Sequence, residues 1–210
     1  MRDDAALREL IDGIVTGDLA LCTRLIQDSP ELAVARFQEG ASRQSANNFF
    51  LPQAQAYIYA GDTALHVAAV TYRTAIAQAL IQAGANARAR NRHGAEPLHY
   101  AAAGQPGSGT WNPSAQAETI AILIHSGADT NPLDKRGVAP LHRAVRTRCA
   151  SAVRALLEHG ADPALKNASG STPMMLAKMN TGRGGSGSTA AKKEQKEIVR
   201  LLEERLAGRA

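Results

Sequence analysis

One short phrase recurs four times along the chain, and this repetition constrains the fold more than any other feature of the sequence. The copies read GDTALH, GAEPLH, GVAPLH and GSTPMM, and they span residues 61–66, 94–99, 137–142 and 170–175. Their glycines are spaced by 33, 43 and 33 residues. A second phrase, which ends in Gly-Ala-Asn or Gly-Ala-Asp, follows the first three copies at residues 80–86, 123–129 and 156–162. Such a period predicts stacked units rather than one central core.

Proline and glycine within the two phrases predict a pair of helices in each unit. The prolines of the last three copies suit the first turn of a helix, where the missing N–H costs nothing and φ is already set. Thr63 and Thr172 are expected to cap these helices, whereas Glu96 and Ala139 replace the capping residue and predict weaker helix starts. The glycine of each second phrase follows the second helix, where a left-handed cap is favoured.

These phrases and their spacing resemble the ankyrin repeat, whose unit of about 33 residues opens with a Thr-Pro-Leu-His-like sequence. The resemblance implies an all-α solenoid of about five helix-turn-helix units with short β-hairpin fingers. We expect a single ankyrin-repeat domain over residues 1–210. Its units are expected at about 1–60, 61–93, 94–136, 137–169 and 170–210. The first unit is degenerate and a charged last helix closes the stack, as terminal repeats commonly depart from the pattern.

Three units are longer than the repeat requires. The first finger carries extra residues at about 34–58, rich in aromatic side chains, which either cover the apolar end of the stack or form a contact surface. The third unit has a loop around Trp111, whose ring either folds back onto its own helices or stands out as an anchor. The fifth has a Gly/Ser run, 182–188, that reads as a flexible tether. We expect the first insertion on the finger side and the other two at the opposite ends of their helices.

The sequence shows no recognisable catalytic or metal-binding pattern. His66, His99 and His142 recur at one phase of the repeat, so each is expected to brace its own turn rather than to hold a metal ion. Cys22 and Cys149 lack the paired spacing of a zinc site and are too few for a disulfide framework. We therefore expect a protein that is not an enzyme and has no cofactor.

Cations gather at the positions that the repeat leaves free. In stacks of the ankyrin kind, the finger tips and the exposed side of the inner helices line a concave groove that binds partners. Seven of thirteen residues at these phases are Arg or Lys and none is acidic. The candidate partner-binding residues are Arg90, Arg92, His93, Tyr100, Lys135, Arg136, Arg143, Arg146 and Lys166, with Trp111 from the loop insertion. The alternative is that these cations form a solvated basic edge that binds no partner.

The resemblance and the groove together predict a protein-interaction module that binds an acidic protein partner. Nucleic acid is a second possible partner, because the arginines suit phosphate contacts and the net charge is +5. A third interpretation is a small-ligand receptor built around Tyr57 and Tyr59, which a cleft with convergent polar groups near these rings would favour.

Features outside the repeat bear on location and assembly. A composition biased to Ala, Arg and Gly is typical of bacterial proteins. Two aspartates stand near the start, where a secretory leader would need basic and then apolar residues. No segment approaches the roughly 20 apolar residues that span a bilayer. We expect a monomeric cytoplasmic protein without a membrane segment.

Overall fold

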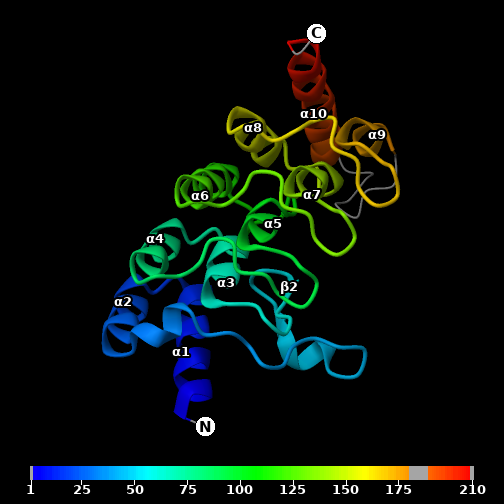
Figure 1. Ribbon diagram of the computed structural model, residues 1–210. Helices are drawn as coiled ribbons and strands as arrows, with labels where there is room; N and C mark the ends of the chain where they lie inside the picture. Colours follow the sequence, from blue (N-terminus) through cyan, green and yellow to red (C-terminus); the bar gives the residue numbers. More distant parts are fainter. Residues whose placement is uncertain (1, 180–188, 209–210) are drawn as a thin grey trace.

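The computed structural model describes residues 2–179 and 189–208, whose helices stack in two layers (Figure 1). The inner layer holds α1 (Arg2–Thr16), α3 (Ala64–Val70), α5 (Pro97–Ala101), α7 (Pro140–Arg146) and α9 (Pro173–Lys178). The outer layer holds α2 (Leu19–Asp28), α4 (Thr74–Gln82), α6 (Pro113–His125), α8 (Ala150–Glu158) and α10 (Thr189–Ala207). The Gly/Ser run 182–188 lies outside the described residues.

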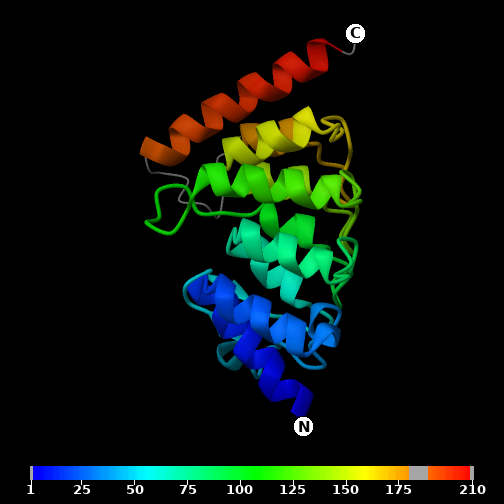
Figure 2. The same ribbon diagram turned by 90° about the vertical axis from the view of Figure 1, so that its left-hand side faces the viewer.

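Each inner helix packs against the outer helix that follows it, and consecutive helices of each layer also pack against one another. Figure 2 shows the outer helices one above the other, with α10 crossing the top of the stack. The all-α solenoid predicted from the repeat is confirmed. The part of the chain that the structure describes contains no helix of the length and apolar character that a membrane crossing requires.

The core runs continuously through the stack and is built from small and aliphatic side chains. Leu65, Leu98 and Leu141 occupy the same phase of successive units and are fully or almost fully buried. Alanines such as Ala68 and Ala101 leave no exposed surface, so neighbouring inner helices pack closely. Each unit thus buries its apolar face against the next unit.

Three histidines brace the helix starts and also connect the units. In His66, His99 and His142, Nδ1 accepts a hydrogen bond from the backbone N–H of the residue before the helix, at 3.0–3.2 Å. The Nε2 of each donates to a carbonyl of the following unit at 2.9–3.2 Å. The predicted local bonds are therefore present, and the bonds between units are an addition that the sequence analysis missed.

Burial keeps these imidazoles neutral. It lowers the pKa of all three, that of His99 to about 3. The fourth copy of the phrase has Met175 at the histidine phase, and this side chain is 52% exposed because no further unit covers it in the described structure.

The fingers form one edge of the stack, which we call the finger edge. At each finger tip an Asn or Asp side chain, from Asn91, Asp134 or Asn167, accepts two backbone N–H groups of its own turn. Consecutive fingers are joined by backbone bonds, such as that from Ala168 N–H to the Arg136 carbonyl at 3.2 Å.

The opposite edge, where each inner helix turns into its outer helix, we call the loop edge. Here side chains rather than backbone groups connect the units. The hydroxyl of Tyr72 donates to the Ala103 carbonyl. Arg148 lies at the same phase two units later and donates to the carbonyls of Ala177, at 3.1 Å, and Met179, at 2.7 Å.

The first insertion crosses from the finger edge to the loop edge. The 3-10 turn η1 (Pro30–Ala33) precedes it, and its elements are the 3-10 turn η2 (Ala46–Phe49) and the strands β1 (Phe50–Leu51) and β2 (Ala56–Tyr57). The strands pair antiparallel, with Phe50 opposite Tyr57. The hairpin turn, residues 53–56, lines a cleft together with the C-terminal ends of α1 and α3. The expectation that this insertion stays on the finger side is therefore wrong for its hairpin.

Candidate partner-binding surface

The structure pairs two of the predicted groove cations with buried acids. Arg90 Nε donates to Glu96 Oε1 at 2.9 Å, and Arg143 Nη2 donates to Asp134 Oδ2 at 3.1 Å. Glu96 is the residue before α5 and Asp134 closes a finger turn, so both acids occupy structural positions. Arg90 is still 58% exposed, but its charge and that of Arg143 are already compensated. Sequence analysis missed these pairs because it considered only the groove phases.

Arg92 and His93 hold the first insertion. Arg92 Nη2 donates to the Ala41 carbonyl, and its guanidinium lies 5.3 Å from the centre of the Tyr59 ring. The His93 ring meets Tyr59 edge to face, with ring centres 4.6 Å apart. Burial and the neighbouring arginines lower the pKa of His93. These two candidates therefore bind a segment of their own chain.

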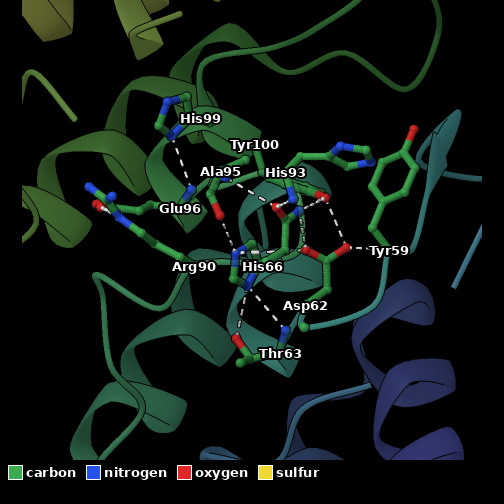
Figure 3. Close-up of polar contacts among 12 residues, drawn as sticks. Tyr59, Asp62, Thr63, His66, Arg90, His93, Ala95, Glu96, His99 and Tyr100 are labelled. Carbon is green, nitrogen blue, oxygen red and sulfur yellow. Dashed lines mark hydrogen bonds and ion pairs between the residues drawn. The ribbon is translucent and has the colours of Figure 1, made fainter. Parts of the chain in front are cut away.

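Tyr100 lies in a buried polar network (Figure 3). Its hydroxyl donates to Asp62 Oδ2 at 2.8 Å and accepts from Asn91 Nδ2 at 2.9 Å. Asp62 Oδ1 accepts from the same Asn91 amide, and Oδ2 also accepts the Tyr59 backbone N–H. Burial and the nearby Asp62 carboxylate raise the pKa of Tyr100 well above its usual value.

The network closes the N-terminal half of the predicted groove. Tyr100 is only 8% exposed and Val67, at a groove phase of the preceding unit, is only 2% exposed. Neither side chain is accessible to a partner. The prediction of Tyr100 as a partner contact in an open groove is therefore wrong, because its hydroxyl is turned into the buried network with Asp62 and Asn91.

Four of the predicted cations remain exposed and form no ion pair within the described residues. They are Lys135, Arg136, Arg146 and Lys166, and we call them the basic surface. Lys135 and Arg136 occupy one finger tip, Lys166 belongs to the next finger, and Arg146 ends α7. The structure thus leaves four cations unpaired on the C-terminal half of the stack, three on the fingers and one at the end of α7.

Comparison with known families agrees with this architecture. Residues 16–108 match the family described as ankyrin repeats (3 copies), and residues 123–177 match the family described as ankyrin repeats (many copies). The chain belongs to the ankyrin repeat family. Chains of this family act in general as non-catalytic protein-interaction modules.

Two relatives of this ankyrin chain are proteins of Mus musculus. It is 36% identical to ankyrin repeat and SOCS box protein 16 over 116 residues, which are 55% of this chain and 25% of that protein. It is 28% identical to B-cell lymphoma 3 protein homolog over 172 residues, 79% of this chain and 37% of that protein. The chain therefore spans only about a quarter to a little over a third of these relatives.

Trp111 does not join the basic surface of the ankyrin stack. Its Nε1 donates to Gln116 Oε1 at 3.0 Å, and the ring packs against the core at the loop edge while keeping part of its surface exposed. The structure thus favours the folded-back alternative. Figure 2 shows the loop that carries Trp111 projecting at the ends of the helices opposite the fingers.

The aromatic first insertion mostly covers the stack. Ile58 is buried, and Phe37 and Phe49 pack against the core, whereas Tyr57 remains 39% exposed. Neither Tyr57 nor Tyr59 lines the large cleft of the structure, which lies at the loop edge. A small-ligand site around these tyrosines would need a cleft with convergent polar groups beside their rings, and this cleft does not lie beside them.

Reactive side chains do not converge in the described residues. Across 2–179 and 189–208, no three His, Cys, Asp or Glu side chains form a candidate metal site. Burial raises the pKa of the Cys22 and Cys149 thiols to about 11, so they are poor nucleophiles at neutral pH.

Proposed function

We propose that the protein is an ankyrin-repeat interaction module whose basic surface binds an acidic segment of a protein partner. The observation that carries this proposal is the set of four exposed cations, Lys135, Arg136, Arg146 and Lys166, which form no ion pair within the described residues. The nearby Asp134 is engaged by Arg143, so it does not neutralise them.

The bonds between fingers fix the spacing of these charges. The Lys135 N–H bonds the His93 carbonyl and the Ala168 N–H bonds the Arg136 carbonyl, so neighbouring finger tips are held side by side. Exposed charge pairs contribute only about 1 kcal/mol or less each in water. Several fixed cations together attract an acidic segment and accelerate its association.

An acidic protein segment fits this surface better than nucleic acid does. Single-stranded nucleic acids are bound by aromatic platforms as well as by cations. Tyr100, the aromatic residue at the groove phases, is buried and hydrogen-bonded instead. The proposal places binding on the C-terminal half of the concave side, because the first insertion covers the N-terminal half.

Peptide selection with matched charge variants tests this proposal. In one variant the basic surface is changed to glutamine (Lys135→Gln, Arg136→Gln, Arg146→Gln, Lys166→Gln). The control carries the same charge change on α10 (Lys192→Gln, Lys193→Gln, Lys196→Gln, Arg205→Gln). We expect peptides selected on the wild type to be rich in Asp and Glu, and to bind the first variant at least tenfold more weakly than the control.

Arg90 and Arg143 are left unchanged in this design, because removing either would leave a buried carboxylate without its cation. Equal affinity of both variants for the selected peptides would refute the basic surface as the binding site. Tight binding of single- or double-stranded oligonucleotides that the first variant loses would favour the nucleic-acid alternative.

The proposal also concerns assembly and location. We propose that residues 1–210 act as one ankyrin domain, monomeric and in the cytoplasm of a bacterial cell. Sedimentation equilibrium tests the monomeric state. A mass well above 22.1 kDa in dilute solution would contradict a monomer.

A further inference from the structure

Two insertions from different units meet at the loop edge and enclose an open cleft of about 990 Å³. One wall is the hairpin turn of the first insertion, residues 53–56. The other wall is the loop of the third unit, residues 108–113, which carries Trp111. The floor includes Val15, Val70 and Thr147 from the C-terminal ends of α1, α3 and α7. The repeat alone would supply the floor, and only the insertions supply the walls.

The lining of the cleft is almost free of charge. Among the lining residues that the structure describes, Arg73 is the one with a charged side chain, and its guanidinium donates to the carbonyls of Ile14 and Val15. The remaining polar side chains are amides and hydroxyls, such as Gln53 and Gln105, and the apolar surface includes Val70 and Trp111. A cationic ligand would lose its hydration here without gaining an opposite charge, and the guanidinium donors of Arg73 toward an anion are already used in part by two carbonyls. The lining therefore fits an uncharged ligand with apolar side chains.

The length of the cleft favours an extended ligand. The cleft reaches from the end of α1 to the end of α7 and so crosses three steps between consecutive inner helices. At about 10 Å between packed helices, this is roughly 30 Å. An extended chain rises about 3.3 Å per residue, so about nine residues fill this length. A compact small molecule would occupy only a part of it.

The wall around Trp111 is fixed before any ligand arrives. Gln116 is fully buried and accepts the Trp111 Nε1–H at 3.0 Å and the Ser151 hydroxyl at 3.1 Å. Its Nε2 donates to the carbonyls of Ala101, at 2.9 Å, and Ala103, at 3.2 Å. Because this aromatic wall is already ordered, ligand binding loses less conformational entropy.

We propose that this cleft binds an extended, uncharged peptide segment of a protein partner. An apolar side chain of the segment packs against Trp111, and its backbone amides bond the glutamine side chains of the rim. This site lies at the loop edge, opposite the three finger cations Lys135, Arg136 and Lys166. It does not depend on the function proposed for the basic surface.

Fluorescence provides a direct test, because Trp111 is the only tryptophan of the chain. The probes are nine-residue peptides, capped at both ends, selected on the wild-type protein from a display library without Asp, Glu, Lys, Arg or His. We expect a saturable change in tryptophan emission on titration. Ala54→Arg, which places a long cation in the hairpin wall, is expected to weaken binding at least tenfold in calorimetry.

Control variants separate this site from others. Ala164→Arg makes the same change at an exposed finger residue and should leave the affinity unchanged, as should the glutamine substitutions of Lys135, Arg136 and Lys166 on the finger edge. Circular dichroism and the urea midpoint show whether Ala54→Arg is folded. If it unfolds, Thr110→Arg in the opposite wall takes its place.

Three results would overturn the proposal. The first is that no peptide of the library gives a saturable emission change. The second is that the wall variant that folds, Ala54→Arg or its replacement Thr110→Arg, binds the peptides as tightly as the wild type. The third is that maltoheptaose, an uncharged oligosaccharide, changes the emission in a manner blocked by Ala54→Arg while the peptides do not.

Discussion

Tyr100 shows how one hydroxyl connects three consecutive parts of the stack. It belongs to α5, it bonds Asp62 at the end of the first finger, and it bonds Asn91 at the tip of the second finger. All three residues are buried, so each polar atom depends on the others for its hydrogen bonds. The sequence showed a tyrosine at a groove phase, but the acceptor that buries it lies 38 residues away.

Removing this hydroxyl should destabilise the protein. We expect Tyr100→Phe to lower the free energy of unfolding by about 2 kcal/mol, because a bond to a buried carboxylate is lost. Tyr57→Phe is the matched control, since Tyr57 is exposed, and should change it by less than about 0.5 kcal/mol. Urea unfolding at neutral pH measures both. Equal effects of the two substitutions would show that the network contributes no net stability.

At the scale of the element, the fingers depend on glycine for two separable reasons. Gly137 has φ of +65°, and a Cβ there would lie 2.7 Å from the backbone nitrogen of Ala168 in the next finger. Gly170 has φ of +77°, but a Cβ there would meet no atom within 4 Å. Glycine is thus required at position 137 by both the left-handed backbone and the close packing of the next finger, and at position 170 by the left-handed backbone alone.

Alanine at these two positions should separate the two contributions. We expect Gly170→Ala to cost about 1 kcal/mol, the penalty of a left-handed alanine. Gly137→Ala should cost clearly more, because the contact with Ala168 must also be relieved. The comparison of their urea midpoints measures the difference. A Gly170→Ala variant as destabilised as Gly137→Ala would mean that contact between fingers adds nothing.

The helix pairs and the finger turns were predictable because short local patterns determine them. Proline at helix starts and glycine after the outer helices are visible in the sequence, and the structure has these residues where expected. The path of the first insertion was not predictable, because no local pattern indicates that its hairpin crosses to the loop edge. The missed role of Arg92 follows from the path of the insertion past Ala41, whereas the wrong expectation for Tyr100 follows from its bond to Asp62, 38 residues away in sequence. The ion pairs of Arg90 with Glu96 and of Arg143 with Asp134 were missed for a different reason, since both acids lie at positions that shape the repeat rather than at groove phases.

At the scale of the whole molecule, the histidine row makes stability depend on pH. His66, His99 and His142 link four consecutive units, and burial lowers the pKa of each. As pH falls through about 6.5, the unfolded chain binds protons at these residues and the folded chain does not. The folded state is therefore favoured above this pH and loses stability below it.

We expect the free energy of unfolding to fall between pH 6.5 and pH 5 by up to about 1.4 kcal/mol per pH unit for each of the three histidines. Urea midpoints at pH 7.5, 6.0 and 5.0 measure the slope. His99→Gln removes one of the titrating groups and should reduce the slope by about a third. A stability that stays constant or rises toward pH 5 would contradict neutral buried imidazoles.

The two edges of the stack are held by different kinds of bond, and this has a mechanical consequence. Backbone bonds join consecutive fingers directly, whereas the loop edge is joined through side chains such as Tyr72 and Arg148. Bending of the solenoid should therefore pivot about the finger edge and spread the loop edge. The spacing of the finger-tip cations should then stay nearly constant, while the width of the cleft beside Trp111 changes as the solenoid bends.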